Sequence, residues 1–356
     1  MAITFERSIT KGCGVPQLPT IEDVALAARV SRQTVSNVIN SPDIVRPETR
    51  ERVQKAITSL GYRPHASARR LRTRKSSTIG IRLDPETNGI SGSVLDRFLH
   101  ALTEQAEHKN LRVLLFTASD PEEEIAQFAR LSDGADVDAF VLTSTFHNDP
   151  RITWLLDNKH TFVTFGRPWG ADDMATSGHR WVDVDGYSGL YDSTVHRLQQ
   201  GHTRVGYIGW PGPSGTGEDR RRGWLQAMTE NSGLALPEIT LLETSATDEV
   251  SRGEAAMLEL MSFPGGVDAV VCASDTLALG AILASSGSIP VSGYDNTPTA
   301  AALGFTSVAQ PLGEVAARAL DLLTSGNSVA PNHHLIRPDL VVRRAQWLLP
   351  RVEVGG

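Results

Sequence analysis

The sequence has little of the chemistry that marks secreted or membrane-bound proteins. It contains two cysteines, Cys13 and Cys272, among 356 residues. That is too few for a disulfide framework and is typical of a protein in a reducing cytoplasm. No charged segment followed by an apolar core begins the chain, and no apolar run is long enough for a membrane span. We therefore expect a cytoplasmic protein with no membrane partner.

Motifs of catalysis and cofactor binding are also missing. The sequence has no G-x-x-x-x-G-K-S/T, so the glycines of segment 215–217 do not form a P-loop, and no G-x-G-x-x-G follows the first predicted strand. The acidic run 122–124 is placed to complement a helix dipole. His333 and His334 lack other His or Cys residues at metal-ligand spacing. We expect no catalytic residue, no cofactor, no metal site and no enzyme activity.

The charge is distributed unevenly along an otherwise ordinary globular composition. Residues 20–75 carry twelve Lys and Arg against five Asp and Glu, whereas the whole chain has a net charge of −7. A basic segment on an acidic remainder is the pattern of a protein that binds phosphate groups with one part only. The total length allows a small domain followed by a large two-lobed one.

The basic segment begins with the pattern of three short helices, after residues 1–19, which we expect to be a disordered N-terminal extension. The first helix follows a capping box at Thr20–Asp23, the second follows the cap residue Ser31, and the third runs from Pro47 to Gly61. The apolar residues that recur at helical spacing are Ile21, Val24, Ala25, Ala28, Val35, Val38, Ile39, Val53, Ala56, Ile57 and Leu60. Two short helices with a tight break and a third supporting helix predict a helix-turn-helix domain over residues 20–63.

The second of these helices has polar residues on its outer face. Arg32, Gln33, Ser36 and Asn37 carry side chains of the kind that reach base edges in a major groove. The alternative is a small helical domain with an ordinary solvated face. The local positive charge favours DNA binding.

The run from Thr20 to Leu71 resembles the headpiece of the LacI family of bacterial transcription regulators. The matching segments are T-I-x-D-V-A, V-S-x-x-T-V-S-x-V-I-N, P-E-T-R-E-R-V and L-G-Y-R-P-x-A-x-A-R-x-L. The resemblance implies that some of these residues read bases and that others set the helix on the DNA backbone. The expected DNA-binding residues are Thr20, Ser31, Arg32, Gln33, Thr34, Ser36, Asn37, His65, Ala68 and Leu71. The family most often has Arg at the position of Asn37, which leaves the operator preference at that base pair open. At the position of His65 the family usually has Asn.

Residues 64–77 are expected to form a hinge helix and linker. Their arginines and the single Leu71 suit a minor groove, where an apolar side chain parts a base step and bends the duplex. The resemblance implies that this hinge becomes helical only on the operator, with Leu71 at a central CG step. A charged interdomain linker is the alternative.

From Thr78 onward the pattern changes to strands alternating with helices such as 94–109 and 121–131. The predicted strands are 78–83, 112–116, 139–143, 161–165, 181–184, 204–209, 268–273 and 291–294. This alternation predicts parallel, doubly wound sheets, and about 270 residues exceed what one such sheet holds. We expect a two-lobed domain over residues 78–350, and the resemblance implies that it is an effector-binding and dimerisation domain. The first lobe is placed at about 78–182 and 309–326, and the second at about 183–308 and 327–350.

The predicted fold is thus a small all-α helix-turn-helix headpiece with a hinge helix, followed by an α/β domain. The resemblance implies that this domain is of the two-lobed periplasmic-binding-protein-like type, with two Rossmann-like parallel sheets.

Ligands of open α/β sheets bind beyond the carboxyl ends of the strands. Arg167, Trp210 and Thr216 follow predicted strands, and Trp224 lies in the next helix. Arg and Asp for bidentate hydrogen bonds and Trp for a flat apolar face are typical of sites that hold polyhydroxylated rings. The alternative is that these residues form ordinary strand-end turns.

The resemblance to the LacI family selects several residues of this set. Arg220-x-x-Gly-Trp224 is similar to the family's effector-binding arginine motif, and Ser274, Asp295 and Gln310 follow in family order. The expected effector-binding residues are Arg220, Asp295, Ser274, Trp224, Trp210, Thr216, Arg167 and Gln310. Ser274 stands where Asn is usual, and the run between Gly287 and Val291 is shorter than usual.

The resulting hypothesis is a homodimeric repressor of sugar-utilisation genes, localised in the bacterial cytoplasm on the nucleoid. A mono- or disaccharide effector would release it from a palindromic double-stranded DNA operator. Two alternatives stay open: control by a purine or a protein corepressor, and a sugar-binding module or enzyme with no function on DNA.

Overall fold

The computed structural model describes residues 19–62, 76–83, 92–170, 174, 178–325 and 332–343. It divides into two compact units, Met1–Lys75 and Ser76–Gly356. The predicted N-terminal extension, apart from residue 19, and residues 64–75 of the predicted hinge lie outside the described residues, so His65, Ala68 and Leu71 stay predictions.

The smaller unit is the predicted helix-turn-helix domain. Its helices are α1 (Ile21–Ala28), α2 (Arg32–Asn40), the 3-10 turn η1 (Pro42–Ile44) and α3 (Pro47–Leu60). The capping box is confirmed, because Thr20 Oγ1 accepts from Asp23 N at 3.3 Å and Asp23 Oδ2 accepts from Thr20 N at 2.8 Å. Arg29 ends α1 in the left-handed conformation, which provides the tight break.

The headpiece core is built from one face of each helix. The predicted apolar residues Val24, Val35 and Val53 have no exposed surface, and they pack with Val38 and Ala56. Tyr62, which the helical periodicity did not include, closes this core just beyond the end of α3. The three helices therefore pack against each other and leave the polar face of α2 uncovered.

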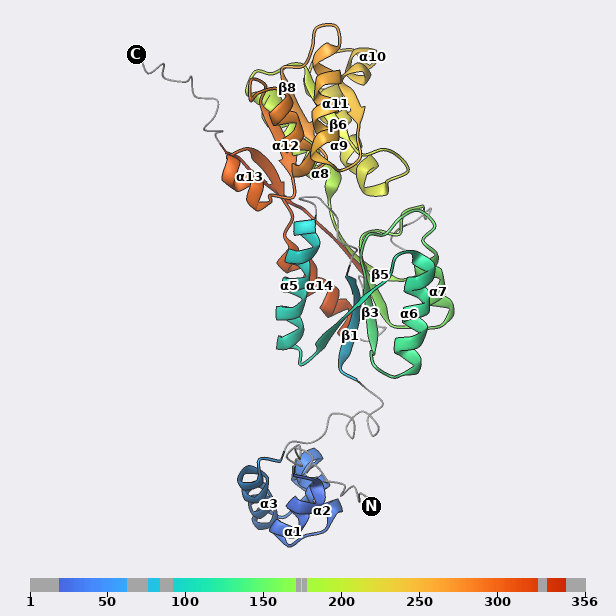
Figure 1. The fold of residues 1–356 in the computed structure, drawn as a ribbon, viewed down its shortest axis with the longest axis vertical. Helices are drawn as coiled ribbons and strands as arrows, with labels where there is room; N and C mark the ends of the chain where they lie inside the picture. Colours follow the sequence, from blue (N-terminus) through green and yellow to red (C-terminus); the bar gives the residue numbers. More distant parts are fainter. Residues whose placement is uncertain are drawn as a thin grey trace, which may run out of the picture. The chain divides into compact units, whose positions relative to one another are not determined.

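The first lobe of the larger unit is a six-stranded parallel sheet with helices on both faces. The strands run in the order β11-β5-β4-β3-β1-β2. Their bounds are β1 (Thr78–Leu83), β2 (Arg112–Thr117), β3 (Ala139–Leu142), β4 (Phe162–Phe165), β5 (Arg180–Val184) and β11 (His333–Ile336). One face carries α5 (Gly92–His108) and α14 (Leu312–Thr324), and the other carries α6 (Pro121–Asp133) and α7 (Pro150–Asp157) (Figure 1).

The second lobe repeats this architecture with one antiparallel edge strand. The order is β12-β10-β9-β8-β6-β7, and only β12 runs against its neighbour among the described strands. The strands are β6 (Val205–Gly209), β7 (Glu243–Ser245), β8 (Ala269–Cys272), β9 (Val291–Tyr294), β10 (Thr306–Ala309) and β12 (Asp339–Val341). The helical segments are α8 (Gly186–Gln199), α9 (Gly215–Asn231), α10 (Leu236–Ile239), the 3-10 turn η3 (Thr240–Leu242), α11 (Val250–Ser262), α12 (Asp275–Ala284) and α13 (Pro298–Leu303).

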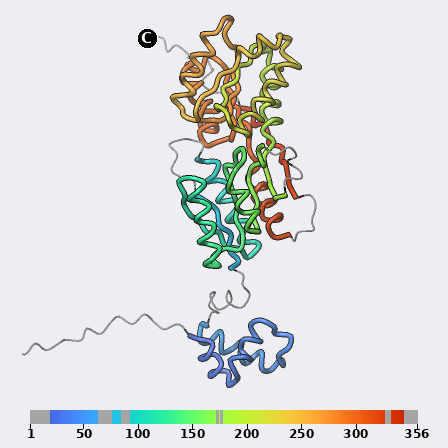
Figure 2. Tube along the Cα trace, turned by 90° about the vertical axis from the view of Figure 1, so that its right-hand side faces the viewer, coloured from blue at the N-terminus to red at the C-terminus, as the bar shows by residue number. Residues whose placement is uncertain are grey.

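Between Ser76 and Arg343, the described elements place three passages between the lobes, after β5, after β10 and after β11. Figure 2 shows the result, a red late segment inside the lobe built mainly from cyan and green residues. The predicted division of residues 327–350 was therefore wrong at β11, because residues 333–336 pair with β5 in the first lobe. The first lobe also extends through Val184 rather than ending at residue 182.

The eight predicted strands are confirmed within one residue at each end. The described residues of the larger unit form three separate apolar clusters, one around β6, β8 and β9 and two on the opposite faces of the first sheet. Parallel strands within each lobe bring their carboxyl ends to one edge, so the loops that follow β1, β3, β4, β6 and β9 face the space between the lobes.

Helices α8 and α9 pack closely in the second lobe because a glycine lies at their contact. A Cβ atom built on Gly223 would meet the carbonyl oxygen of Tyr187 at 2.1 Å. Backbone atoms of a packed helix cannot move aside as a flexible side chain can, so α9 holds its position over the sheet only with glycine here.

We predict that Gly223→Ala destabilises the protein although alanine is the better helix former. The gain in helix propensity is about 1 kcal/mol, whereas overpacking against backbone costs about 1–3 kcal/mol or more. The matched control is Gly313→Ala in α14, where a Cβ would meet nothing within 4 Å. This control should be neutral or stabilising by up to about 1 kcal/mol. Urea unfolding of the three proteins measures the difference, and equal stability of both variants would contradict the close contact.

Candidate functional site

The exposed face of α2 presents the residues that were predicted to meet DNA. Ser31, Arg32 and Gln33 are exposed, and Thr34, Ser36 and Asn37 are half-buried. The helix is held at its start by Ser31, whose Oγ accepts from Thr34 N at 3.1 Å. Backbone N–H groups and hydroxyls therefore gather at the N-terminus of α2, where an anion is favoured.

The long side chains of this face have only weak contacts that DNA could replace. Arg32 Nη1 lies 3.0 Å from Glu22 Oε1, with both side chains more than half exposed. Gln33 Nε2 donates to Asn37 Oδ1 at 3.0 Å. An exposed ion pair contributes about 0–1 kcal/mol, so exchanging Glu22 for a phosphate or a base costs Arg32 little.

A cavity of about 590 Å³ lies between the two lobes of the larger unit, at the carboxyl ends of their strands. The first lobe provides apolar walls, among them Leu95 and Phe165, and the polar segment Thr143–Thr145. The second lobe provides mainly polar residues, which are Trp210, Ser214, Thr216, Arg220, Asp248, Asp295 and Gln310. One apolar wall facing a set of hydrogen-bonding groups is typical of a small-molecule site.

Arg220 is the central cation of this cavity. Its guanidinium lies over the ring of Tyr294 at 3.6 Å and over the ring of Trp210 at 4.8 Å. Nη1 donates to the carbonyl oxygen of Ala273, and Nη2 lies 3.9 Å from Asp295 Oδ1. The side chain is almost fully buried, so its charge acts in a low dielectric and its direction is fixed by four neighbours.

Three buried polar atoms of the cavity walls have no hydrogen-bond partner among the described residues. They are Arg220 Nε, Trp210 Nε1 and Thr143 Oγ1. A buried donor without a partner costs about 1–3 kcal/mol, and such groups in folded proteins ordinarily have one. Their common location therefore points to a ligand with several hydrogen-bond acceptors.

Asp295 is held in an unusual backbone conformation, with φ at 101°. Its side chain accepts from Gln310 Nε2 at 2.6 Å, and its carbonyl oxygen accepts from Arg97 Nη1 of the first lobe at 3.1 Å. Burial raises the pKa of Asp295, while Arg220 and Gln310 oppose that shift. Backbone strain in a buried residue that is held by several hydrogen bonds is typical of a functional position.

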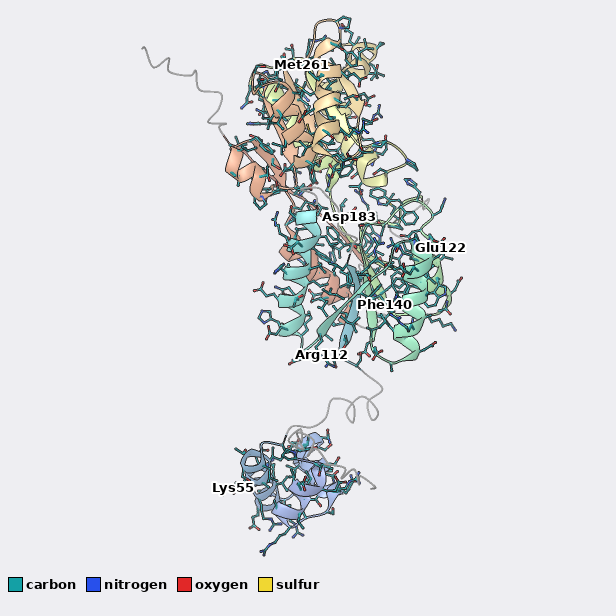
Figure 3. All side chains as sticks on the ribbon, in the orientation of Figure 1. Lys55, Arg112, Glu122, Phe140, Asp183 and Met261 are labelled. Atoms are coloured by element: carbon teal, nitrogen blue, oxygen red, sulfur yellow. The ribbon has the colours of Figure 1, made fainter. Side chains whose placement is uncertain are left out.

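Asp183 connects the cavity to a second buried cation, Arg167. Figure 3 shows Asp183 at the end of the first lobe that faces the second lobe, and its carboxylate Oδ2 accepts from Arg167 Nε at 2.8 Å. Arg167 also pairs with Asp219 of α9, so this guanidinium joins the two lobes. Burial raises the pKa of Asp183, and Arg167 counteracts the shift.

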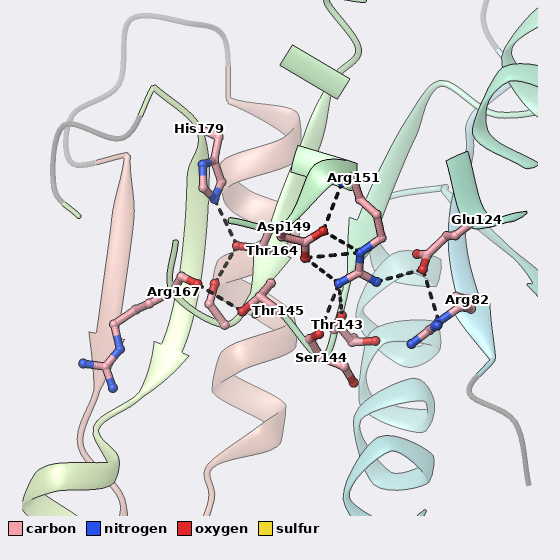
Figure 4. Close-up of polar contacts among 11 residues, drawn as sticks. Arg82, Glu124, Thr143, Ser144, Thr145, Asp149, Arg151, Thr164, Arg167 and His179 are labelled. Carbon is pink, nitrogen blue, oxygen red and sulfur yellow. Dashed lines mark hydrogen bonds and ion pairs between the residues drawn. The ribbon is translucent and has the colours of Figure 1, made fainter. Parts of the chain in front are cut away.

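A buried ion network fixes the polar segment that follows β3. Arg151 pairs with Asp149 Oδ2 at 2.6 Å and with Glu124 Oε2 at 2.8 Å. Its Nη2 also donates to the carbonyl oxygens of Thr143 and Ser144, as Figure 4 shows. The donor directions of a planar guanidinium are fixed. Arg151 therefore fixes the backbone of the loop after β3 on the side away from the cavity.

The structure brings five of the eight predicted effector-binding residues to the cavity. These are Trp210, Thr216, Arg220, Asp295 and Gln310. Ser274 caps α12 instead, and its hydroxyl donates to Asp248 Oδ1, so it supports a residue that lines the cavity. The predicted roles of Arg167 and Trp224 at the cavity surface were wrong: Arg167 lies behind Asp183, and Trp224 has no exposed surface and donates from Nε1 to Val205 O at 2.9 Å.

The sequence reasoning missed several cavity residues. Asp183 sits inside the strand pattern W-V-D-V, where a polar residue before a strand end was the available signal. Asp248 lies in the loop after the short strand β7, which was not predicted. Among the described residues, no group of three or more His, Cys, Asp or Glu could hold a metal ion, and no described helix is long and apolar enough to cross a membrane.

Asp275 supports the cavity from behind Asp295. Its carboxylate accepts from Ser307 Oγ at 2.6 Å and from Thr297 N at 2.7 Å. A Cβ on Gly293 would meet Asp275 Oδ1 at 2.1 Å, so glycine at the end of β9 makes this approach possible. Burial raises the pKa of Asp275 to about 7, although both hydrogen bonds favour the carboxylate.

We predict that this carboxyl makes stability depend on pH. Its folded pKa is raised above the unfolded value of 3.8, so the folded protein holds the proton to higher pH and the free energy of unfolding falls from about pH 4 to about pH 7. The variant Asp275→Asn cannot ionise at this position, so its free energy of unfolding lacks this pH dependence. Between about pH 4 and pH 7, the difference in free energy of unfolding, variant minus wild type, should therefore rise by about 2–4 kcal/mol. Chemical unfolding at several pH values measures the difference, and a difference independent of pH would contradict the raised pKa.

The comparisons with known proteins match both units. Residues 20–65 match the family described as bacterial regulatory proteins, lacI family, and residues 194–345 match a periplasmic binding protein-like domain. The chain is 32% identical to the HTH-type transcriptional regulator AglR of Rhizobium meliloti (strain 1021) in an alignment of 360 positions that covers 94% of this chain and 99% of the relative. It is also 32% identical to the HTH-type transcriptional regulator CelR of Thermobifida fusca over 345 residues, covering 92% and 98%.

Solved structures show the same fold. A transcriptional regulator CelR–cellobiose complex matches with a TM-score of 0.65 at 28% identity, covering 92% of this chain and 99% of that one. The lac repressor dimer bound to operator and the anti-inducer ONPF matches with a TM-score of 0.77 at 21% identity, with the same coverage, and supports the fold alone. The helix-turn-helix unit, the two-sheet α/β unit and the close relatives agree, and the chain belongs to the LacI family of DNA-binding transcriptional regulators.

Proposed function

We propose that this protein is a repressor of sugar-utilisation genes and that a neutral sugar releases it from a palindromic operator. The observation that carries the proposal is the inter-lobe cavity with three unpartnered buried donors beside apolar walls. A sugar ring has acceptor hydroxyls for those donors and an apolar face for Phe165, Leu95 or Trp210. The relative CelR, described in a complex with cellobiose, supports the same class of ligand.

The charge of the cavity favours a neutral ligand over an anionic one. Among the described lining residues there are four carboxylates, those of Asp96, Asp183, Asp248 and Asp295, and one guanidinium, that of Arg220. Arg220 is already close to Asp295, and a sugar phosphate would add negative charge to this set. Carboxylates are acceptors for sugar hydroxyl donors, so they complement the free donors of Arg220, Trp210 and Thr143.

On the DNA side, we propose that α2 enters the major groove. Arg32, Gln33 and Asn37 would contact base edges, and Ser31, Thr34 and Ser36, with Thr20 at the start of α1, would contact the phosphate backbone. A homodimer would place two such helices on the two halves of a palindrome. His65, Ala68 and Leu71 would then act at its centre, in the minor groove of a CG step.

The coupling would run through the contacts that cross between the lobes. A sugar bound to Arg220 and Asp295 lies next to the carbonyl of Asp295, which Arg97 of the first lobe holds. It also lies next to Asp183, which holds Arg167 and through it α9. A ligand that changes these contacts changes how the lobes close, and a coupling of about 1–3 kcal/mol between the sites is typical of allosteric proteins.

The direct test is fluorescence anisotropy on a labelled palindromic duplex with a central CG step, taken from the DNA that flanks this protein's gene. It would be titrated with and without a panel of neutral sugars. Tight binding that one sugar reverses is the expected result. Tight binding that no sugar weakens, or that a purine or a second protein strengthens, would replace the sugar by a corepressor. Binding no tighter than to unrelated DNA at the same salt concentration would contradict the proposal that this palindrome is the operator.

We predict that Arg220→Ala keeps operator binding but loses release. Operator affinity without sugar should stay within about twofold, whereas the sugar concentration for half release should rise at least about tenfold, the value of a hydrogen bond to a charged group. The matched control is Arg252→Ala, in α11 of the same lobe, because Arg252 is exposed and does not line the cavity. Equal effects of the two substitutions would contradict the role of Arg220.

We predict the opposite separation for Leu71→Ala. Loss of the apolar side chain should weaken operator binding by about tenfold or more, because the base step at the centre would no longer be held apart. Sugar affinity, measured by calorimetry on the same preparation, should be unchanged. A similar loss in both measurements would mean that the substitution acts on folding and not on the operator.

A further inference from the structure

A second cavity of about 470 Å³ lies beside the first, at the carboxyl ends of β6 and β7. The two cavities share Trp210 and Ser214, so the loop between β6 and α9 forms a wall of both. The first lobe contributes the exposed His147, which belongs to the loop after β3. Like the first cavity, it is therefore built from both lobes.

The second cavity lies on the side of the cleft away from the three connections between the lobes. Those connections leave β5, β10 and β11, and β12 is at the same end of its sheet. Strands β6 and β7 form the opposite end of the second sheet. A ligand that extends from the first cavity past Trp210 and Ser214 would therefore reach the second without meeting the crossing strands.

The polar groups of the second cavity are arranged before any ligand binds. Arg221 Nε and Nη2 donate to Glu243 Oε2 and Oε1 at 2.5 and 2.6 Å. This hydrogen-bonded pair raises the pKa of Arg221, and its members remain 34% and 21% exposed. Arg221 Nη1 also lies 3.5 Å from Glu218 Oε1, so two carboxylates share this guanidinium, and the group offers carboxylate lone pairs and guanidinium N–H donors to hydroxyl groups.

The remaining walls suit the other parts of a sugar ring. The hydroxyl of Ser245 is exposed on the edge strand β7, and Trp210 provides an aromatic ring. Alternating donors and acceptors beside an apolar surface are what a glycosyl unit requires, and a charged ligand would have to break the pair of Arg221 and Glu243.

We propose that the second cavity is a separate glycosyl subsite, so that the effector is a disaccharide or a longer oligosaccharide. One ring occupies the cavity of Arg220 and Asp295, the glycosidic link passes Trp210 and Ser214, and the next ring lies against Arg221, Ser245 and His147. This inference rests on the proposed sugar effector and adds the size of the sugar to it.

The test is isothermal titration calorimetry of the full-length protein with maltose, cellobiose, trehalose, lactose and melibiose, and with glucose and galactose. At least one disaccharide should bind about tenfold or more tightly than either monosaccharide, since a ring with two or three additional hydrogen bonds is expected to contribute that much. Ser245→Trp fills the second cavity from an edge strand that tolerates aromatic residues. It should reduce the disaccharide affinity to the level of the monosaccharide.

Two further variants separate the cavities. His147→Ala removes only the wall provided by the first lobe and should lower the disaccharide affinity about threefold to tenfold, without changing the binding of a monosaccharide. Ser262→Trp is the matched control, because Ser262 is exposed at the end of α11 and lines neither cavity. It should change neither affinity, and all variants should keep the operator affinity and the unfolding temperature of the wild type.

Each other outcome overturns the subsite. If monosaccharides bind as tightly as every disaccharide, or if Ser245→Trp weakens both to the same extent, the second cavity holds no ring, although the sugar effector stands. If no sugar of either size binds, the proposed effector class fails and the subsite fails with it.

Discussion

The buried guanidinium of Arg220 is the constraint on which the ligand cavity depends. It reaches the carbonyl of Ala273 just after β8, the ring of Tyr294 in β9, the ring of Trp210 after β6 and the carboxylate of Asp295. Three strand ends are thus positioned by one side chain from α9. Its planar group has a fixed set of donor directions, so a lysine could not hold the same partners.

The ion pairs that cross between the lobes have short distances and are buried, but their net contribution to the free energy is modest. Arg167 with Asp183 and Asp219 is almost fully buried, and such pairs roughly balance their Coulombic gain against the loss of hydration. These contacts therefore define how the two lobes are oriented, but they stabilise that arrangement by less than several kcal/mol. A ligand shifts such an equilibrium only by its difference in affinity between the two arrangements, and here a few kcal/mol suffice.

Much of this architecture is predictable from the sequence, because the strands are apolar runs bounded by turn residues and the headpiece helices have explicit caps. The capping box at Thr20 and the helix end at Gly61 are local features that need no tertiary information. The lobe to which β11 belongs is different. It depends on whether the chain crosses the cleft once more, and no local pattern in residues 327–336 encodes that crossing.

The same distinction applies within the candidate site. Position after a strand identified Trp210, Thr216 and Asp295, because carboxyl ends of parallel strands meet at one edge, whereas Gln310 was selected by the family resemblance alone. The direction in which a side chain points could not be predicted from its position after a strand. Arg167 also follows a strand, yet its side chain turns back to Asp183 and to Asp219, a residue distant in sequence. Asp248 follows a strand of three residues, too short to give a periodic signal.

Trp224 shows most clearly why residue type alone is insufficient. It lies one turn after Arg220 on the same face of α9, about 6 Å farther along the helix axis. Because the first turn of α9 begins at the edge of the cavity, that distance places Trp224 in the apolar core beneath it. There its ring stacks on Tyr207 at 5.3 Å, and Tyr207 is a wall of the second cavity. The tryptophan that the sequence placed at the ligand therefore supports the strand and the helix from which both cavities are built.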